Sequence, residues 1–262
     1  MKYGICSWVV PKKQEELFSY VKKLGLDGIT LELTYNADGA FSISKDDIQL
    51  FKDLSKKYSI EIPTLALNGL CIKGMTKSKN REDVSLLFDK ALEICKLLNI
   101  KMLQVPSFLD SYIYNSNELN ESIFNLKLLC EKTIMYNIKV GTENGLNIEQ
   151  NRYLLSQINM DNLFIFFDTQ NTARCTNISS TTFFEELQDD ILQIHLKDSH
   201  DDINTPLQLG EGNTHFIESC KSIKESKYND WLILESEYKV FDNFDSILKN
   251  DIETVKSIFG KD

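Results

Sequence analysis

The sequence lacks the features that mark membrane, secreted and nucleic-acid-binding proteins. It contains no apolar run long enough to cross a bilayer as a helix. Its first residues offer no apolar segment of the secretory type, so we expect a cytoplasmic protein that does not enter a membrane. The net charge is −10, from 39 acidic and 29 basic residues. This balance argues against nucleic acid as a partner, because phosphate backbones are bound by clustered lysine and arginine.

Cysteine, proline and glycine are also too few or too scattered to build the sites that they often mark. The six cysteines form no C-x-x-C pair, which argues against a zinc ribbon and against a disulfide framework in a chain of this size. With only 4 prolines and 11 glycines, the chain shows no linker. No G-x-G-x-x-G fingerprint follows the first apolar run, so an open dinucleotide-binding sheet has no support. We therefore predict that residues 1–262 form a single domain.

Short apolar runs alternate with amphipathic segments along the whole chain. The runs predict eight strands, which are YGICSWVV, GITLEL, IEIPTLAL, IKMLQVP, IKVGTEN, LFIFFD, ILQIHLK and WLILESE. Between them, and after the last, lie eight segments whose apolar residues recur at helical spacing. Ser44, ahead of Asp46 and Asp47, is a favourable N-cap for the second of these helices.

This strict alternation of strand and helix predicts the fold. Strands that alternate with helices form a parallel sheet with right-handed crossovers. Eight such units favour closure into an α/β fold of the (β/α)8 TIM-barrel type over an open doubly wound sheet. The length of 262 residues also fits, since such barrels need about 250. In TIM barrels the active site lies at the carboxyl ends of the strands, so the last residues of each predicted strand are the candidates for function.

The last four predicted strands each end in a side chain that can bind a metal ion. These side chains are Glu143, Asp168, His195 and Glu235. Any one of them alone is better explained as a rim residue or a hydrogen-bonded core residue. Three carboxylates at one barrel mouth, however, would repel each other unless a cation neutralised their charge. We therefore predict one divalent ion, with Mn²⁺ favoured by the oxygen-rich ligand set and Mg²⁺, Co²⁺ or Zn²⁺ as alternatives.

Several motifs resemble those of the xylose isomerase-like TIM barrels, a superfamily of sugar and sugar-phosphate isomerases and epimerases. The matching segments are VGTEN, FFDTQN, IHLKDS, LGEGNTHF and WLILESE, which together extend the likeness over essentially the whole chain. The pair HLKD and LGEGN is the most specific. The resemblance implies that Glu143, Asp168, His195 and Glu235 bind the metal ion. It also implies that Glu143 and Glu235 are catalytic and move protons on opposite faces of the substrate.

These implied roles suit the removal of a proton from the carbon beside a carbonyl group. A metal ion stabilises the developing enediolate, and two facing carboxylates allow one to take a proton and the other to return one. The predicted function is therefore a metal-dependent isomerase or epimerase of a ketose or ketose phosphate. The expected partner is this small sugar or sugar phosphate, and the sequence leaves open a homo-oligomer.

The segment after the sixth strand departs from a pattern found in many epimerases of the family. They carry D-x-x-H there, whereas this chain has Asp168-Thr169-Gln170-Asn171. Asn171 can hydrogen-bond a substrate but cannot share a proton as histidine does. The D-x-x-N motif resembles that of certain pentulose-phosphate epimerase relatives, which favours a phosphorylated ketose as the substrate. Arg174, one of only three arginines, is then a candidate phosphate ligand, with an ordinary surface arginine as the alternative.

Four further residues are predicted to bind substrate, namely Lys197, Glu32, Asn68 and Glu211. Lys197 follows His195 closely, and it would hydrogen-bond Glu143 or the substrate, or else form a rim salt bridge with Asp198. Two other functions stay open: a keto-inositol isomerase or dehydratase on the same metal site, and a barrel that binds a sugar without converting it. The apurinic endonuclease branch of the superfamily is excluded, because it needs more histidines than the three present. Of these, His200 is expected in a loop and His215 at the start of a helix.

Overall fold

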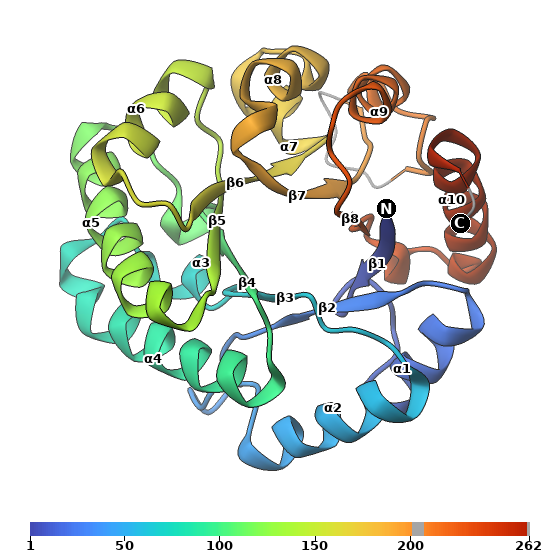
Figure 1. Ribbon diagram of the computed structural model, residues 1–262, viewed down its shortest axis with the longest axis horizontal. Coiled ribbons are helices and arrows are strands. Elements are labelled where there is room, and N and C mark those ends of the chain that lie inside the picture. The colour runs from blue at the N-terminus through green and yellow to red at the C-terminus, as the bar shows by residue number, and fades with distance from the viewer. Residues whose placement is uncertain (201–206, 261–262) are drawn as a thin grey trace.

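Eight parallel strands close into a ring, and helices surround the ring on its outside (Figure 1). The computed structural model describes residues 1–200 and 207–260. Each strand pairs in parallel with the next in the chain, and β1 pairs with β8 to complete the barrel. The predicted (β/α)8 TIM barrel is therefore confirmed.

The eight strands are those that the apolar runs predict. They are β1 (Lys2–Cys6), β2 (Gly28–Glu32), β3 (Thr64–Ala66), β4 (Met102–Pro106), β5 (Lys139–Glu143), β6 (Leu163–Asp168), β7 (Ile191–Leu196) and β8 (Trp231–Leu234). The longer helices are α1 (Gln14–Lys23), α2 (Lys45–Tyr58), α4 (Arg81–Leu98), α5 (Ser116–Thr133), α6 (Ile148–Ile158), α8 (Ser180–Leu187), α9 (Phe216–Glu225) and α10 (Phe244–Phe259).

Two short helices break the strict alternation that the sequence predicts. One is α3 (Leu70–Lys73), which follows β3, and the other is α7 (Asn171–Thr176), which follows β6. Within the described residues, β3 and β6 are thus each followed by two α-helices rather than one. Helices of 4 and 6 residues span too few turns to show an apolar period, so the pattern cannot reveal them. The difference matters because α7 begins at the end of a strand that carries a site residue.

Two glycines of the barrel make room for large side chains on other strands. A Cβ atom on Gly141 would lie 2.1 Å from the Phe166 ring, and one on Gly28 would lie 2.6 Å from the Trp231 ring. At these two positions a small residue and a large one therefore fill the space together. A packed interior leaves the carboxyl ends of the strands as the place where polar side chains can meet a ligand.

Helix α2 begins as predicted from the sequence. Ser44 Oγ accepts a hydrogen bond of 3.1 Å from the Asp47 amide, and the Asp47 carboxylate accepts one of 2.9 Å from the Ser44 amide. This reciprocal pair is a capping box, which satisfies two amides that the helix itself cannot. The predicted N-cap at Ser44 is therefore confirmed.

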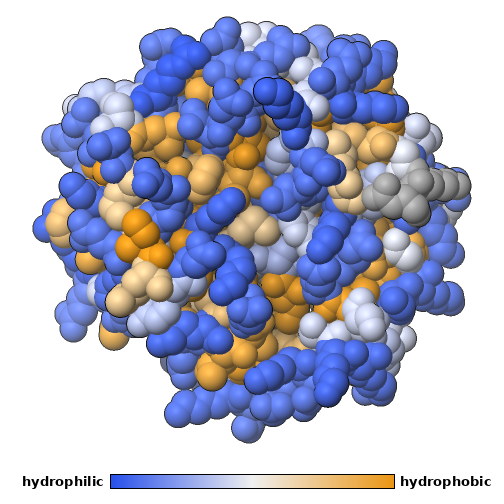
Figure 2. All heavy atoms as spheres, viewed as in Figure 1, coloured by the Kyte–Doolittle hydropathy of each residue, from blue (hydrophilic) through white to orange (hydrophobic). Residues whose placement is uncertain are grey.

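The helices turn their apolar sides toward the strands. Phe18 of α1, Phe88 of α4 and Phe184 of α8 are all fully buried in one continuous hydrophobic core. The face seen in Figure 2 is largely hydrophilic, with smaller hydrophobic areas between the polar side chains. In the part of the chain that the structure describes, no helix has the length and apolar character of a membrane span.

Candidate metal centre

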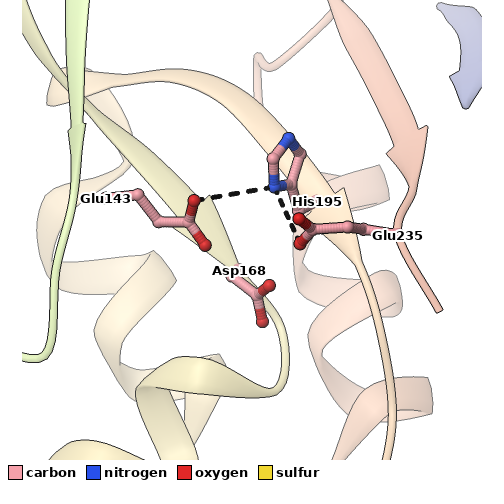
Figure 3. Close-up of side chains that lie close together, drawn as sticks. All are labelled: Glu143, Asp168, His195 and Glu235. Carbon is pink, nitrogen blue, oxygen red and sulfur yellow. Dashed lines mark ion pairs between the residues drawn. The ribbon is translucent and has the colours of Figure 1, made fainter. Parts of the chain in front are cut away.

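Four side chains that can bind a metal ion meet at the carboxyl ends of β5 to β8 (Figure 3). Glu143, Asp168, His195 and Glu235 each offer one ligand atom, and these atoms all lie within 4.8 Å of one another. Glu143 and Asp168 are the last residues of β5 and β6, His195 lies one residue before the end of β7, and Glu235 follows β8 directly. Because neighbouring parallel strands end at the same edge of the barrel, the four side chains converge.

The cluster is buried, and several of its polar atoms have no hydrogen-bond partner in the part of the chain that the structure describes. The exposed fractions of Glu143, Asp168, His195 and Glu235 are 3%, 2%, 0% and 8%. Among the described residues, Asp168 Oδ2, both ring nitrogens of His195 and Glu235 Oε2 find no hydrogen-bond partner. The contact of His195 Nδ1 with Glu235 Oε2, at 3.1 Å, is an ion pair. Buried polar atoms normally have partners, so this donor set fits a cation that would satisfy several of them at once.

The pKa values of the cluster show how unfavourable its charges are without a cation. Burial raises the pKa of Glu143 to about 7, and the charge of Glu235 adds to this shift. Burial likewise raises the pKa of Asp168 to about 6. Burial alone would lower the pKa of His195, but the charge of Glu235 outweighs it and brings that pKa to about 9. Burial acts upward on Glu235 too, yet the positive charges of His195 and Lys197 bring its pKa down to about 2.

These pKa values predict that metal affinity rises with pH and that binding releases protons. Glu143, Asp168 and His195 must lose their protons before they can bind an ion. In the metal-free protein the same three groups hold more protons when folded than when unfolded. The free energy of unfolding is therefore expected to fall as the pH rises from about 4 to about 9, and bound metal should offset that loss.

Titration calorimetry with Mn²⁺ at about pH 6 and about pH 8 tests this prediction. Two buffers with different ionisation enthalpies would reveal the released protons, and thermal unfolding of the metal-free protein would follow its stability. Equal affinity at both pH values, with no proton release, would contradict the assigned pKa values.

Two amide side chains hold the carboxylate of Glu143. Asn171, the first residue of α7, donates its Nδ2 to Glu143 Oε1 over 3.0 Å. Gln104 of β4 donates its Nε2 to Glu143 Oε2. Asn171 was predicted to bind substrate, and the structure places it against a member of the cluster. Gln104 is not among the residues predicted from the sequence, although its position near the end of β4 is a signal that could have revealed it.

The two carboxylate oxygens of Asp168 differ in their contacts. Its Oδ1 accepts hydrogen bonds of 2.7 Å from the amides of Gln170 and Asn171. These bonds orient the start of α7 and with it the side chain of Asn171. Its Oδ2 accepts no hydrogen bond from residues 1–200 or 207–260 and could bind a cation. The D-x-x-N motif thus links the cluster and the helix that follows it.

Lys197 lies beside Glu235 rather than in the rim salt bridge with Asp198 that the sequence allowed. Its Nζ is 3.9 Å from Glu235 Oε2, and the charges of Glu235, Asp168 and Glu143 outweigh burial to raise its pKa. Asp198 is buried instead against a loop, where its carboxylate accepts from the amides of Gly210 and Gly212 at 2.9 and 3.0 Å. The charge of Lys197 therefore lies next to the cluster, and the carboxylate of Asp198 binds the loop instead.

The remaining predicted substrate residues lie around this edge of the barrel. Asn68 donates its Nδ2 to Glu32 Oε2 over 3.0 Å, and Glu32 also lines a cavity of about 460 Å³. Arg174 of α7 lines another cavity of about 310 Å³ together with His215, the N-cap residue of α9. Glu211 is exposed in the loop between β7 and α9. His200 lies outside any helix or strand, as expected.

The comparisons with known proteins agree with this arrangement. A family model described as a xylose isomerase-like TIM barrel matches residues 18–258, so the resemblance that the motifs indicate is confirmed. Over 257 residues the chain is 26% identical to the uncharacterized protein MJ1311 of Methanocaldococcus jannaschii, with 90% of this chain and 84% of that protein covered.

Three solved structures are similar in fold. The 3-keto-D-glucoside 4-epimerase YcjR from E. coli has a TM-score of 0.77 at 15% identity, over 98% of this chain and 99% of its own. The D-allulose 3-epimerase from Methylomonas sp., in complex with D-allulose, also has a TM-score of 0.77 at 16% identity, and the match covers 98% of this chain and 96% of that one. The IOLI protein with a binding zinc atom has a TM-score of 0.75 at 17% identity, and the match covers 99% of this chain and 98% of that one. At these identities the likeness shows the fold alone.

Proposed function

Because the chain belongs to the xylose isomerase-like TIM barrel family, we propose that it is a divalent-metal-dependent isomerase or epimerase of a ketose or ketose phosphate. The observation that carries the proposal is the buried cluster of Glu143, Asp168, His195 and Glu235. Three carboxylates and one imidazole with orphaned polar atoms suit a divalent ion. A barrel that only binds a sugar would not need two glutamates buried on opposite sides of such a cluster.

The four residues of the cluster would hold the ion, and the ion when bound supplies Lewis-acid stabilisation for an enediolate. Glu143 and Glu235 extend from β5 and β8 toward each other across the cluster (Figure 3). A substrate bound between them would therefore meet one carboxylate on each face. Without an ion their pKa values are pushed apart, to about 7 and about 2, but both glutamates would be ionised when they hold the ion, so either carboxylate could take the first proton from the face that it meets.

The neighbouring polar residues would orient these groups and the substrate. Asn171 fixes the carboxylate of Glu143 through its 3.0 Å hydrogen bond. Lys197, 3.9 Å from Glu235, can donate to a substrate oxygen that gains negative charge. The Glu32–Asn68 pair at the ends of β2 and β3 offers both acceptors and donors for sugar hydroxyls. The ketose class is further supported by the two neighbours whose names describe them as sugar epimerases.

Exchange of carbon-bound hydrogen in D₂O tests the proposed reaction. The protein with Mn²⁺ would be incubated with a panel of ketoses, ketose phosphates and keto-inositols, and deuterium incorporation would be followed by NMR. We expect incorporation beside the carbonyl of one ketose or ketose phosphate, and none after metal is removed by a chelator. Exchange with a keto-inositol alone would favour the keto-inositol isomerase or dehydratase. Binding of a sugar without any exchange would favour a non-catalytic barrel.

The variant Arg174→Ala is expected to raise KM for a phosphorylated ketose by roughly tenfold or more while kcat changes less. Arg174 lines a polar cavity with Asn177, Ser179 and Asn213, and a guanidinium binds phosphate through paired hydrogen bonds. Such an anchor contributes equally to binding the ground state and the transition state, so its loss appears in KM.

A suitable control for this prediction is Arg152→Ala. Arg152 lies on α6 and forms surface ion pairs with Glu149 and Glu186, so its loss should leave the kinetics unchanged. Steady-state kinetics with a ketose phosphate and its unphosphorylated counterpart would separate the cases. Unaltered kinetics of Arg174→Ala would assign Arg174 to the surface alone.

A further inference from the structure

Asp251 is a fully buried carboxylate on α10, outside the barrel and apart from the metal cluster. Its exposed fraction is 0%, and within residues 1–200 and 207–260 no ion pair neutralises it. Each of its oxygens accepts one hydrogen bond from a different loop. The amide of Leu209 donates to Oδ1 over 3.0 Å, and the hydroxyl of Tyr238 donates to Oδ2 over 2.8 Å.

Both loops belong to the edge of the barrel where the candidate site lies. Leu209 is two residues before Glu211, in the loop between β7 and α9. Tyr238, which is itself fully buried, is three residues after Glu235, in the segment between β8 and α10. One carboxylate on the outer helix therefore connects the segment that follows a cluster residue to the loop that carries a predicted substrate residue.

The loop is fixed from its other side by Asp198. The carboxylate of Asp198 accepts from the amides of Gly210 and Gly212 and from the hydroxyl of Thr214 over 2.6 Å. A Cβ atom on Gly212 would lie only 2.2 Å from Asp198 Oδ1, so the loop approaches this carboxylate as closely as the backbone allows. The hydrogen bonds of Asp198 connect the loop to the end of β7, and those of Asp251 connect it to the segment after β8.

The burial of this carboxylate is unfavourable in itself. Removal from water raises the pKa of Asp251 to about 7; the hydrogen bonds from Leu209 and Tyr238 oppose the shift, and the charge of Glu211 adds to it. An apolar side chain at this position of α10 would avoid the desolvation penalty. What a carboxylate adds is two directed hydrogen bonds, which an apolar residue cannot make.

We infer that Asp251 is a positioning residue that holds residues 207–214, which include Glu211, in a fixed place relative to Glu235. It acts through Leu209 and Tyr238. Its effect on turnover rests on the proposed function, whereas its effect on the two loops does not.

Hydrogen–deuterium exchange of the backbone tests the link without any substrate. The exchange test uses Asp251→Ala, in which neither donor keeps an acceptor, because Asp251→Asn would deprive only one of the two donors. We expect peptides within 207–214 and within 236–241 to exchange roughly tenfold faster or more, and to do so together. Tyr238→Phe should act on the same two segments. Glu253→Gln removes an exposed charge from the same helix and should leave both segments unchanged.

Kinetics then separate positioning from a merely structural role. Asp251→Asn should lower kcat/KM for the substrate several-fold while the affinity for Mn²⁺ stays unchanged. The double variant with Tyr238→Phe should lose little more, because both substitutions break the same connection between the two segments. Faster exchange in only one segment, or a uniform increase along α10, would overturn the inference. So would normal kcat/KM in an Asp251→Asn protein whose wild type turns over the substrate. If the wild type converts no sugar, the proposed function fails, and the exchange result alone decides whether Asp251 joins the two loops.

Discussion

Glu143→Gln and Glu235→Gln proteins are expected to retain a divalent ion and to lose turnover by at least about 10²–10⁴-fold, the usual size of general acid–base catalysis. Glutamine keeps one oxygen that can bind a metal ion, but its amide does not ionise and cannot take or return a proton. The two variants should therefore separate metal binding from chemistry. Loss of turnover would be larger still if metal affinity also fell.

The surroundings of the two glutamates predict a difference between these variants. Both oxygens of Glu143 accept from amide donors, one from Asn171 and one from Gln104. A glutamine at 143 would direct its own amide N–H groups at one of these donors. Glu235 instead faces His195, 3.1 Å from its Oε2, whose ring can exchange a proton. We therefore expect Glu143→Gln to disturb its local hydrogen bonds more than Glu235→Gln does.

The decisive measurement for both variants is turnover at saturating Mn²⁺, with occupancy checked by calorimetry. Asp168→Asn is the matched comparison, because Asp168 belongs to the cluster but has no predicted role in proton transfer. Its activity should be reduced through metal affinity and partly restored by excess Mn²⁺. If Glu143→Gln and Glu235→Gln both regained near-normal turnover at saturating metal, the mechanism with two carboxylates would be wrong.

The barrel and the convergence of the four side chains could be predicted because both depend on simple geometry. Each apolar run is a buried strand, and parallel strands bring their last residues to one edge. Glu143, Asp168, His195 and Glu235 each close such a run, so their meeting follows from the alternation of strands and helices. No tertiary contact has to be known in advance, which is why sequence and structure agree here.

Other features depend on contacts that no local pattern encodes. Helix α7 is too short to show a period, yet it decides that Asn171 contacts Glu143. The sequence places Lys197 next to Asp198, but the loop amides of Gly210 and Gly212 occupy the Asp198 carboxylate. Asp251 lies in an amphipathic helix, where a charged residue is ordinarily assigned to the solvent side. Its burial follows from two distant donors, Leu209 and Tyr238.

The variant His195→Ala is expected to lower the affinity for Mn²⁺ by at least about 100-fold, beyond the 10- to 100-fold typical of losing an outer-shell partner. His195 is fully buried between the two glutamates, with its Nδ1 3.1 Å from Glu235 and 3.8 Å from Glu143. The ring of Phe166 packs edge-on against the ring of His195, with 5.4 Å between the ring centroids, and holds the orientation of His195. Alanine would remove the neutral nitrogen ligand and leave the three carboxylates as the remaining members of the cluster.

The same change should alter the metal-free protein in a way that a stability assay can follow. Without His195, Glu235 loses the largest of the influences that lower its pKa, and its carboxylate becomes costlier to keep charged in a buried place. The metal-free variant should then be less stable at neutral pH than the metal-free wild type, and added Mn²⁺ should restore less of the difference. His200→Ala, in a nearby loop, is the matched control and should bind Mn²⁺ normally. A His195→Ala protein that kept full stoichiometric affinity for Mn²⁺ would remove His195 from the metal site.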